Sequence, residues 1–120
     1  FKDKNLDSVV RLVGDDSEVF GVTLMDATYR NLKVGTRGMV QWTKNFAWES
    51  ETDCVSTTGD GMRVYNSFFK TNDDCLKPYY PNTTFWNNVV WHQGTGRAIM
   101  ISWGNSGMND WNYDETHKVL

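Results

Sequence analysis

The aspartates at 53, 73 and 74 are the residues whose type and spacing best suit chemistry. Asp53 and Cys54 form a step that recurs 21 residues later as Asp74 and Cys75, and Asp73 directly precedes Asp74. If the two stretches lie side by side, three carboxyl groups meet, and such close like charges cannot all ionise cheaply. One group then keeps a proton near neutrality. A proton donor beside carboxylates that activate water is what glycoside hydrolysis requires.

Two interpretations of the same aspartates without catalysis stay open. Clustered carboxylates can hold calcium, because that cation prefers several oxygen ligands. An acidic turn can also simply face solvent. We predict acid–base chemistry with no metal site and no cofactor.

The segments that must position these aspartates look like short strands. Apolar residues seldom recur at helical spacing, while β-branched and aromatic residues alternate with polar ones. Such runs occupy residues 20–24, 39–43, 63–69, 83–91 and 98–103. Hairpin dipeptides are nearly absent between them, which argues against a meander or a sandwich.

The strand starts repeat along the chain. Steps of 20, 24 and 21 residues separate Phe20, Val40, Val64 and Phe85. Repeats of this length without helices predict an all-β fold, a right-handed parallel β-helix of about five coils stacked about 4.8 Å apart. The stacking places Asn66 over Asn87 as an inward asparagine ladder. Coincidental spacing in another all-β fold is the alternative.

The length of 120 residues predicts one domain, residues 1–120, without an internal boundary. Neither end looks like a cap for a solenoid, so we expect a partial β-helix. Further chain segments or subunits would then cover its open ends.

Composition excludes two classes of partner. A net charge of −3 leaves no broad basic surface for nucleic acid. A mean hydropathy of −0.57 and the lack of a long apolar run argue against a membrane span. The six Trp, five Tyr and six Phe suit polysaccharide recognition as well as an ordinary core.

Two features suggest a secreted, extracellular location. Asn82 begins an Asn-Thr-Thr sequon, a possible glycosylation site. In-register stacking would bring Cys54 and Cys75 within disulfide distance, although buried reduced cysteines would stack equally well. A bridge would itself favour an oxidising compartment.

Residues 40–104 resemble the β-helical glycoside hydrolases. Thr52-Asp53 is followed about one repeat later by Asp73-Asp74 and then by Leu76-Lys77, with Trp48 upstream and Ser-Trp-Gly at 102–104. This pattern is most similar to glycoside hydrolase family 49, the dextranase and isopullulanase group, and more distantly to the family 28 polygalacturonases.

The resemblance implies an inverting hydrolase of a neutral glucan of the dextran or pullulan type. By position, Asp73 resembles the general acid, and Asp53 with Asp74 the pair that holds and deprotonates water. Inversion requires about 6.5–9.5 Å between acid and base. Substrate-binding candidates, with Lys77 and Arg97 also as electrostatic tuners, are Lys77, Trp48, Tyr79, Trp91, His92, Arg97 and Trp103.

The chain departs from the family pattern at three places. Cys54 stands where these families usually have Gly or another small residue. Asp60 is a rival upstream acid, but the interval from Asp60 to Asp73 is much shorter than one coil, which places Asp60 on another side of the solenoid. His92 is followed by Gln93, and a basic step that would grip a uronate is missing, so pectin is the weaker substrate.

A second function stays open beside hydrolysis. A β-helix without catalysis, serving as a scaffold or glycan-binding component of an extracellular filament, coat or wall assembly, is the alternative. The short chain and its uncapped ends favour it, because few coils leave little room for a long substrate groove.

Overall fold

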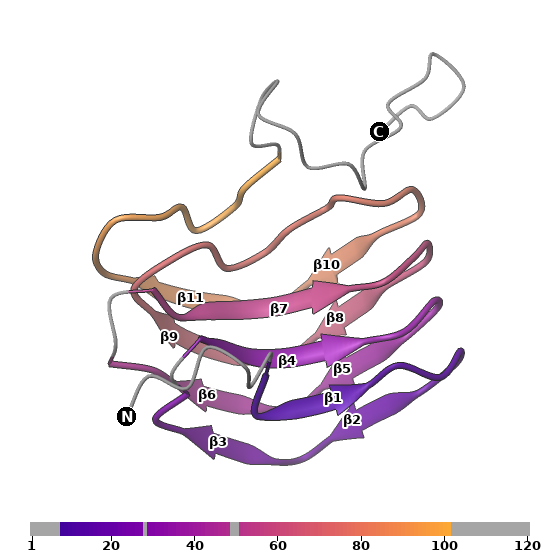
Figure 1. The fold of residues 1–120 in the computed structure, drawn as a ribbon, viewed down its shortest axis with the longest axis horizontal. Coiled ribbons are helices and arrows are strands. Elements are labelled where there is room, and N and C mark those ends of the chain that lie inside the picture. The colour runs from indigo at the N-terminus through magenta and orange to yellow at the C-terminus, as the bar shows by residue number, and fades with distance from the viewer. Residues whose placement is uncertain (1–7, 28, 49–50, 102–120) are drawn as a thin grey trace.

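A computed structural model describes residues 8–27, 29–48 and 51–101. This part of the chain contains strands and no helix, and all its strand pairs are parallel. The strands form three sheets that run up the molecule (Figure 1).

Sheet A contains β1 (Val10–Leu12), β4 (Arg30–Val34) and β7 (Asp53–Thr57). Sheet B contains β2 (Glu18–Phe20), β5 (Met39–Gln41), β8 (Arg63–Tyr65) and β10 (Thr84–Trp86). Sheet C contains β3 (Thr23–Met25), β6 (Lys44–Phe46), β9 (Phe68–Thr71) and β11 (Val89–His92).

The chain visits sheets A, B and C in that order and then rises to the next turn (Figure 1). The prediction of an all-β parallel solenoid is therefore confirmed. The described residues make about four turns. A bridge between Leu76 and Ile99 marks the opening of a further turn.

The repeat inferred from the sequence needs a shift of one residue in the first turn. Val40 pairs with Val64, and Val64 with Phe85, as the alignment of strand starts predicts. Val19, however, pairs with Val40, and Phe20 pairs with Gln41. Because side chains alternate across a strand, the shift puts Val19 in the core and leaves Phe20 exposed.

The bend between sheets B and C uses the left-handed backbone conformation in every described turn. The residues at this corner, with φ of 69°, 55°, 50° and 50°, are Gly21, Trp42, Asn66 and Asn87. Gly and Asn tolerate this conformation better than other residues. Asn87 Nδ2 donates to Asn66 Oδ1 at 2.8 Å, so these two asparagines stack as predicted. The pair is exposed and not inward, because a residue at the corner points away from the core.

Aliphatic and aromatic side chains from the three sheets fill the interior. The fully buried apolar side chains include Leu32, Val34, Val40, Val55, Val64 and Phe69. Each such side chain contributes about 1.5–3 kcal/mol on burial. None of the described residues belongs to a helix long and apolar enough to cross a membrane.

Sheet A is one strand shorter than its neighbours. Sheets B and C gain β10 and β11 in the fourth turn, whereas sheet A ends at β7 within the described residues. The corresponding part of the fourth turn follows β9 and includes Leu76, which forms only an isolated bridge. The three aspartates lie where β7 meets this irregular segment.

Candidate acidic site

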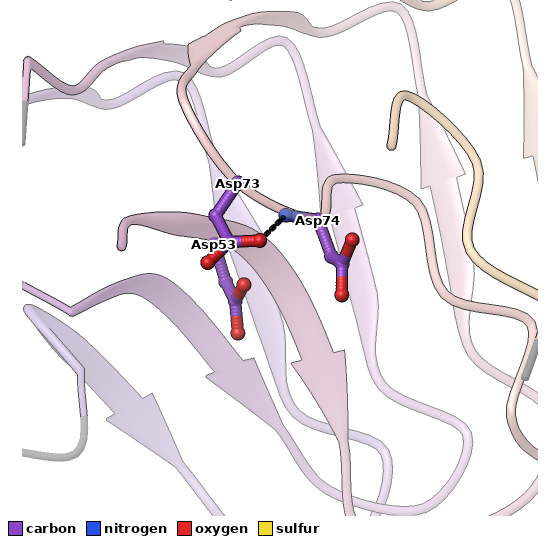
Figure 2. A group of neighbouring side chains, drawn as sticks. All are labelled: Asp53, Asp73 and Asp74. Carbon is purple, nitrogen blue, oxygen red and sulfur yellow. Dashed lines mark hydrogen bonds between the residues drawn. The ribbon is translucent and has the colours of Figure 1, made fainter. Parts of the chain in front are cut away.

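The structure brings the three aspartates together from two successive turns. Asp53 is the first residue of β7, and Asp73 and Asp74 lie in the turn that follows β9. One carboxylate oxygen from each residue lies within 4.8 Å of the others (Figure 2). Asp60 is exposed and falls outside this cluster.

Backbone contacts dock the turn that carries Asp73 onto the segment before Asp53. The Asp73 amide donates to Thr52 O at 3.2 Å, and the Thr71 hydroxyl donates to the same carbonyl. The Asp74 amide donates to Asp73 Oδ1 at 2.9 Å (Figure 2). These bonds fix Asp73 relative to the start of β7.

Asp53 is a buried carboxylate shared by two cations. Lys77 Nζ donates to Asp53 Oδ2, and Arg30 Nε lies 3.4 Å from the same oxygen. Burial raises the pKa of the Asp53 carboxyl, and the charge and hydrogen bond of Lys77, followed by the charge of Arg30, oppose this shift. Burial prevails, so the carboxyl binds a proton more readily than an exposed aspartate does.

Sequence inspection missed Arg30. It opens β4 and pairs directly with Asp53 across sheet A, one repeat earlier in the chain. Its guanidinium also lies 4.4 Å from the centre of the Tyr29 ring. The repeat could have identified this residue, since one period before Asp53 falls at Arg30.

Asp74 is almost fully buried, and its Oδ1 accepts a hydrogen bond from the Arg97 amide at 3.0 Å. The Arg97 guanidinium donates to the carbonyls of Thr95 and Gly96. Arg97 therefore contacts the cluster through its backbone, while its guanidinium binds its own loop.

Asp73 is the most accessible of the three aspartates. Partial burial raises the pKa of its carboxyl, and the negative charges of Asp74 and Glu51 raise it further. The hydrogen bond from the Asp74 amide and the charge of Lys77 act in the opposite direction. A raised pKa together with access to solvent is what a proton donor to substrate requires.

The chemistry open to the cluster depends on its cations as well as its acids. The three carboxylates could offer oxygen ligands to a metal ion, but Lys77 already binds Asp53 Oδ2. The separation of at most 4.8 Å is shorter than the roughly 6.5–9.5 Å typical of inverting hydrolases. The arrangement therefore suits proton transfer within a compact group of acids.

Two of the predicted sugar-binding aromatics are exposed beside the acidic turn. Trp48 follows β6, and its carbonyl accepts a hydrogen bond from Asn72 Nδ2 at 2.5 Å. Trp91 lies on β11, where it pairs with Lys70 of β9. Lys70 Nζ stands 3.9 Å from the centre of the Trp48 ring. Lys70 has no signal in the sequence that would have singled it out.

The remaining predicted residues occupy varied positions. Tyr79 is half-buried, with its ring centre 6.0 Å from Lys77 Nζ, and His92 is half-buried at the end of β11. Asn82 is exposed in the turn before β10, and Trp103 lies outside the described residues. A buried disulfide joins Cys54 and Cys75.

Comparison with known proteins relates the chain to dextranases. It is 31% identical over 70 residues to a dextranase of Arthrobacter sp. (strain CB-8) and 30% identical over 70 residues to a dextranase of Arthrobacter globiformis. Each alignment covers 58% of this chain but only 11% of the dextranase. No family model matches the sequence. No solved structure matches it either.

Proposed function

We propose that this chain carries the acid site of a dextranase-like glycoside hydrolase that cleaves a neutral glucan of the dextran or pullulan type. The convergence of three carboxylates from successive turns, within 4.8 Å of one another, is the observation that carries the proposal. The similarity to two dextranases supports the choice of substrate class.

The environments of the aspartates support a division of roles. Asp73 acts as the general acid, because its carboxyl has a raised pKa and is the most accessible. Asp53 and Asp74 hold and deprotonate the attacking water. Lys77 and Arg30 favour the ionised form of the buried Asp53 carboxyl, which a base needs, against the effect of burial.

Inversion is the stereochemical course that we propose, following the resemblance of residues 40–104 to an inverting family. The short spacing between the carboxylates means that Asp73, the least buried, must swing away from Asp53 and Asp74 to admit substrate and water. Proton NMR of the first-formed reducing end tests this point. Net retention of the anomeric configuration would contradict inversion.

A site for polysaccharide binding without hydrolysis is the second candidate function. The contacts of two of the acids favour this second candidate. Asp53 is paired with Lys77 and Arg30, and Asp74 accepts a hydrogen bond from the Arg97 amide. In that case, the carboxylates would stabilise the fold and the exposed indoles alone would bind glucan.

Secretion belongs to the same proposal. The buried disulfide supports an oxidising compartment, and Asn82 of the sequon lies in a turn between β9 and β10. Intact-protein mass before and after enzymatic removal of N-glycans tests the second feature. A protein isolated from its natural source with free thiols would argue against secretion.

Release of reducing ends from dextran, pullulan and polygalacturonate tests the proposed activity. We expect activity on the neutral glucans and a loss of about 10²–10⁴-fold in kcat for Asp73→Asn, the range expected for a general acid. Asp60→Asn is the matched control, because Asp60 lies outside the cluster, and it should retain wild-type activity. Binding of dextran by the wild type with no product from any polymer would favour the second candidate.

A further inference from the structure

The two turns that bring the acids together are not joined there by a regular strand ladder. In the described residues, β7 pairs with β4 on one side, and the segment after Asp74 contributes only the isolated bridge of Leu76 to Ile99. Sheets B and C, by contrast, continue through β10 and β11. The spacing of the acids therefore depends on contacts other than strand pairing.

The disulfide lies at this gap in sheet A. Cys54 directly follows Asp53, and Cys75 directly follows Asp74. The Cα atoms of the two cysteines are 4.4 Å apart, and both side chains are fully buried. The covalent link thus joins the two turns one residue away from an acid on each side.

Beyond the bonds that the Asp73 amide and the Thr71 hydroxyl donate to Thr52 O, the hydrogen bonds between β7 and the segment after Asp74 are irregular. The Cys54 amide donates to Asp74 O at 3.1 Å, while the Val55 amide reaches Cys75 O at 3.5 Å, beyond the usual range for a backbone bond. Fixing the turns here also keeps Asp53 within reach of Lys77, which lies two residues after Cys75. The bridge is the strongest restraint on the relative position of these side chains.

We propose that the Cys54–Cys75 disulfide is a positioning element of the acid site, holding Asp53 and Asp74 at the separation used to activate water. The inference rests on the proposed function, since it assigns a task within that same site. It predicts that opening the bridge impairs the chemical step more than substrate binding.

A purely structural disulfide would behave differently. A bridge between cysteines at a sequence separation of 21 stabilises the fold by restricting the unfolded chain. Loss of activity through general destabilisation must therefore be separated from loss of positioning. Val64→Ala supplies the control, because Val64 is fully buried in β8, in sheet B, and lies outside the acid cluster.

The experiment compares wild type, C54A/C75A and Val64→Ala at a temperature where all three are folded by circular dichroism. A displacement of about 1 Å in a catalytic group can cost about 10²-fold in rate. We expect kcat of C54A/C75A on dextran to fall by about 10-fold to 100-fold with KM changed less than about threefold. Val64→Ala should keep wild-type kcat.

The pH profile gives a second readout that a structural role would not change. Burial is the main cause of the raised pKa of Asp53, so a loosened turn should lower that pKa and move the acidic limb to lower pH. Wild-type kcat and pH limbs in C54A/C75A would overturn the proposal. An equal loss of kcat in Val64→Ala would overturn it too.

A wild type that cleaves none of the polymers would contradict the proposed function and leave the positioning claim testable by NMR. The ¹³C titration of the Asp53 carboxyl should then shift to lower pH in C54A/C75A, because the group becomes better solvated. Identical titration curves in the bridged and open forms would overturn the positioning role.

Discussion

Asp53 is a buried carboxyl group on which burial and two neighbouring cations act in opposite directions. Its burial disfavours the charged form, while Lys77 and Arg30 bind the same oxygen and favour it. Two cations on one buried acid leave its protonation state sensitive to small changes around it. This sensitivity suits a group that must gain and lose a proton during each catalytic cycle.

Replacing Lys77 by Met should destabilise the protein in a pH-dependent way. The folded-state pKa of Asp53 is raised, so its contribution to stability falls as pH rises from the ordinary aspartate value of about 3.9 through the folded value. Lys77→Met removes the main positive charge that favours the ionised Asp53 carboxyl. The loss of stability with rising pH therefore becomes larger. Urea unfolding should show a loss of up to about 3–5 kcal/mol at pH 7 and a clearly smaller loss at pH 4.

Lys44→Met is the matched control for this change. Lys44 is exposed on β6, and its replacement should alter the free energy of unfolding by no more than about 0.5 kcal/mol at either pH. An equal loss for Lys77→Met at both pH values would show that the ammonium does not act through the ionised Asp53 carboxylate.

At the scale of the element, the loop after β11 covers the acidic turn. A Cβ placed on Gly96 would lie 2.5 Å from the Asp73 carbonyl carbon and from the Asp74 amide nitrogen. Real Cβ atoms do not approach backbone so closely, so only a glycine lets the loop lie on this peptide. The same loop presents the Arg97 amide to the Asp74 carboxylate. The loop after β11 therefore packs directly against Asp73 and Asp74 and is bonded to Asp74.

Gly96→Ala should therefore damage both stability and activity. The clash is with backbone atoms that cannot move without shifting Asp73 and Asp74. We expect a loss of about 1–3 kcal/mol in the free energy of unfolding and a lower kcat. Gly14→Ala is the control, because a Cβ there meets no atom within 4 Å, and it should be nearly neutral in both measurements. Unchanged kcat in Gly96→Ala would show that the loop does not support the acids.

At the scale of the whole molecule, the repeat explains why part of the site is predictable. The recurrence of the Asp-Cys step one turn later places Asp53, Asp74 and both cysteines in adjacent turns, because stacking converts sequence period into proximity. The repeat also explains why the alignment of Phe20 with Val40 was wrong by one residue. Its length varies from turn to turn, so the sequence alone does not tell which side of a strand a residue faces. Lys70 was not predicted, because nothing in the repeat indicates that its ammonium lies over the Trp48 ring.

Two exposed tryptophans, Trp91 and Trp86, lie on different faces of the solenoid. Trp91 lies on sheet C in register with Lys70, shortly before the loop that packs on Asp73 and Asp74, whereas Trp86 lies on sheet B. Both indoles are more than half exposed, so both can be truncated without opening a core cavity. A glucan bound along the acid site would therefore depend on Trp91 and be indifferent to Trp86.

Thermal unfolding with an isomalto-oligosaccharide tests this prediction in Asp73→Asn, whose turnover should be too slow to consume the ligand during the measurement. Ligand at about 100 times its Kd should stabilise the folded protein by about 2.7 kcal/mol and raise Tm accordingly. Adding Trp91→Ala should remove most of this rise, while adding Trp86→Ala should leave it intact. Dependence on Trp86 alone would move the glucan site to sheet B. Oligogalacturonate should give a smaller shift, because the net negative charge of the chain disfavours an acidic ligand.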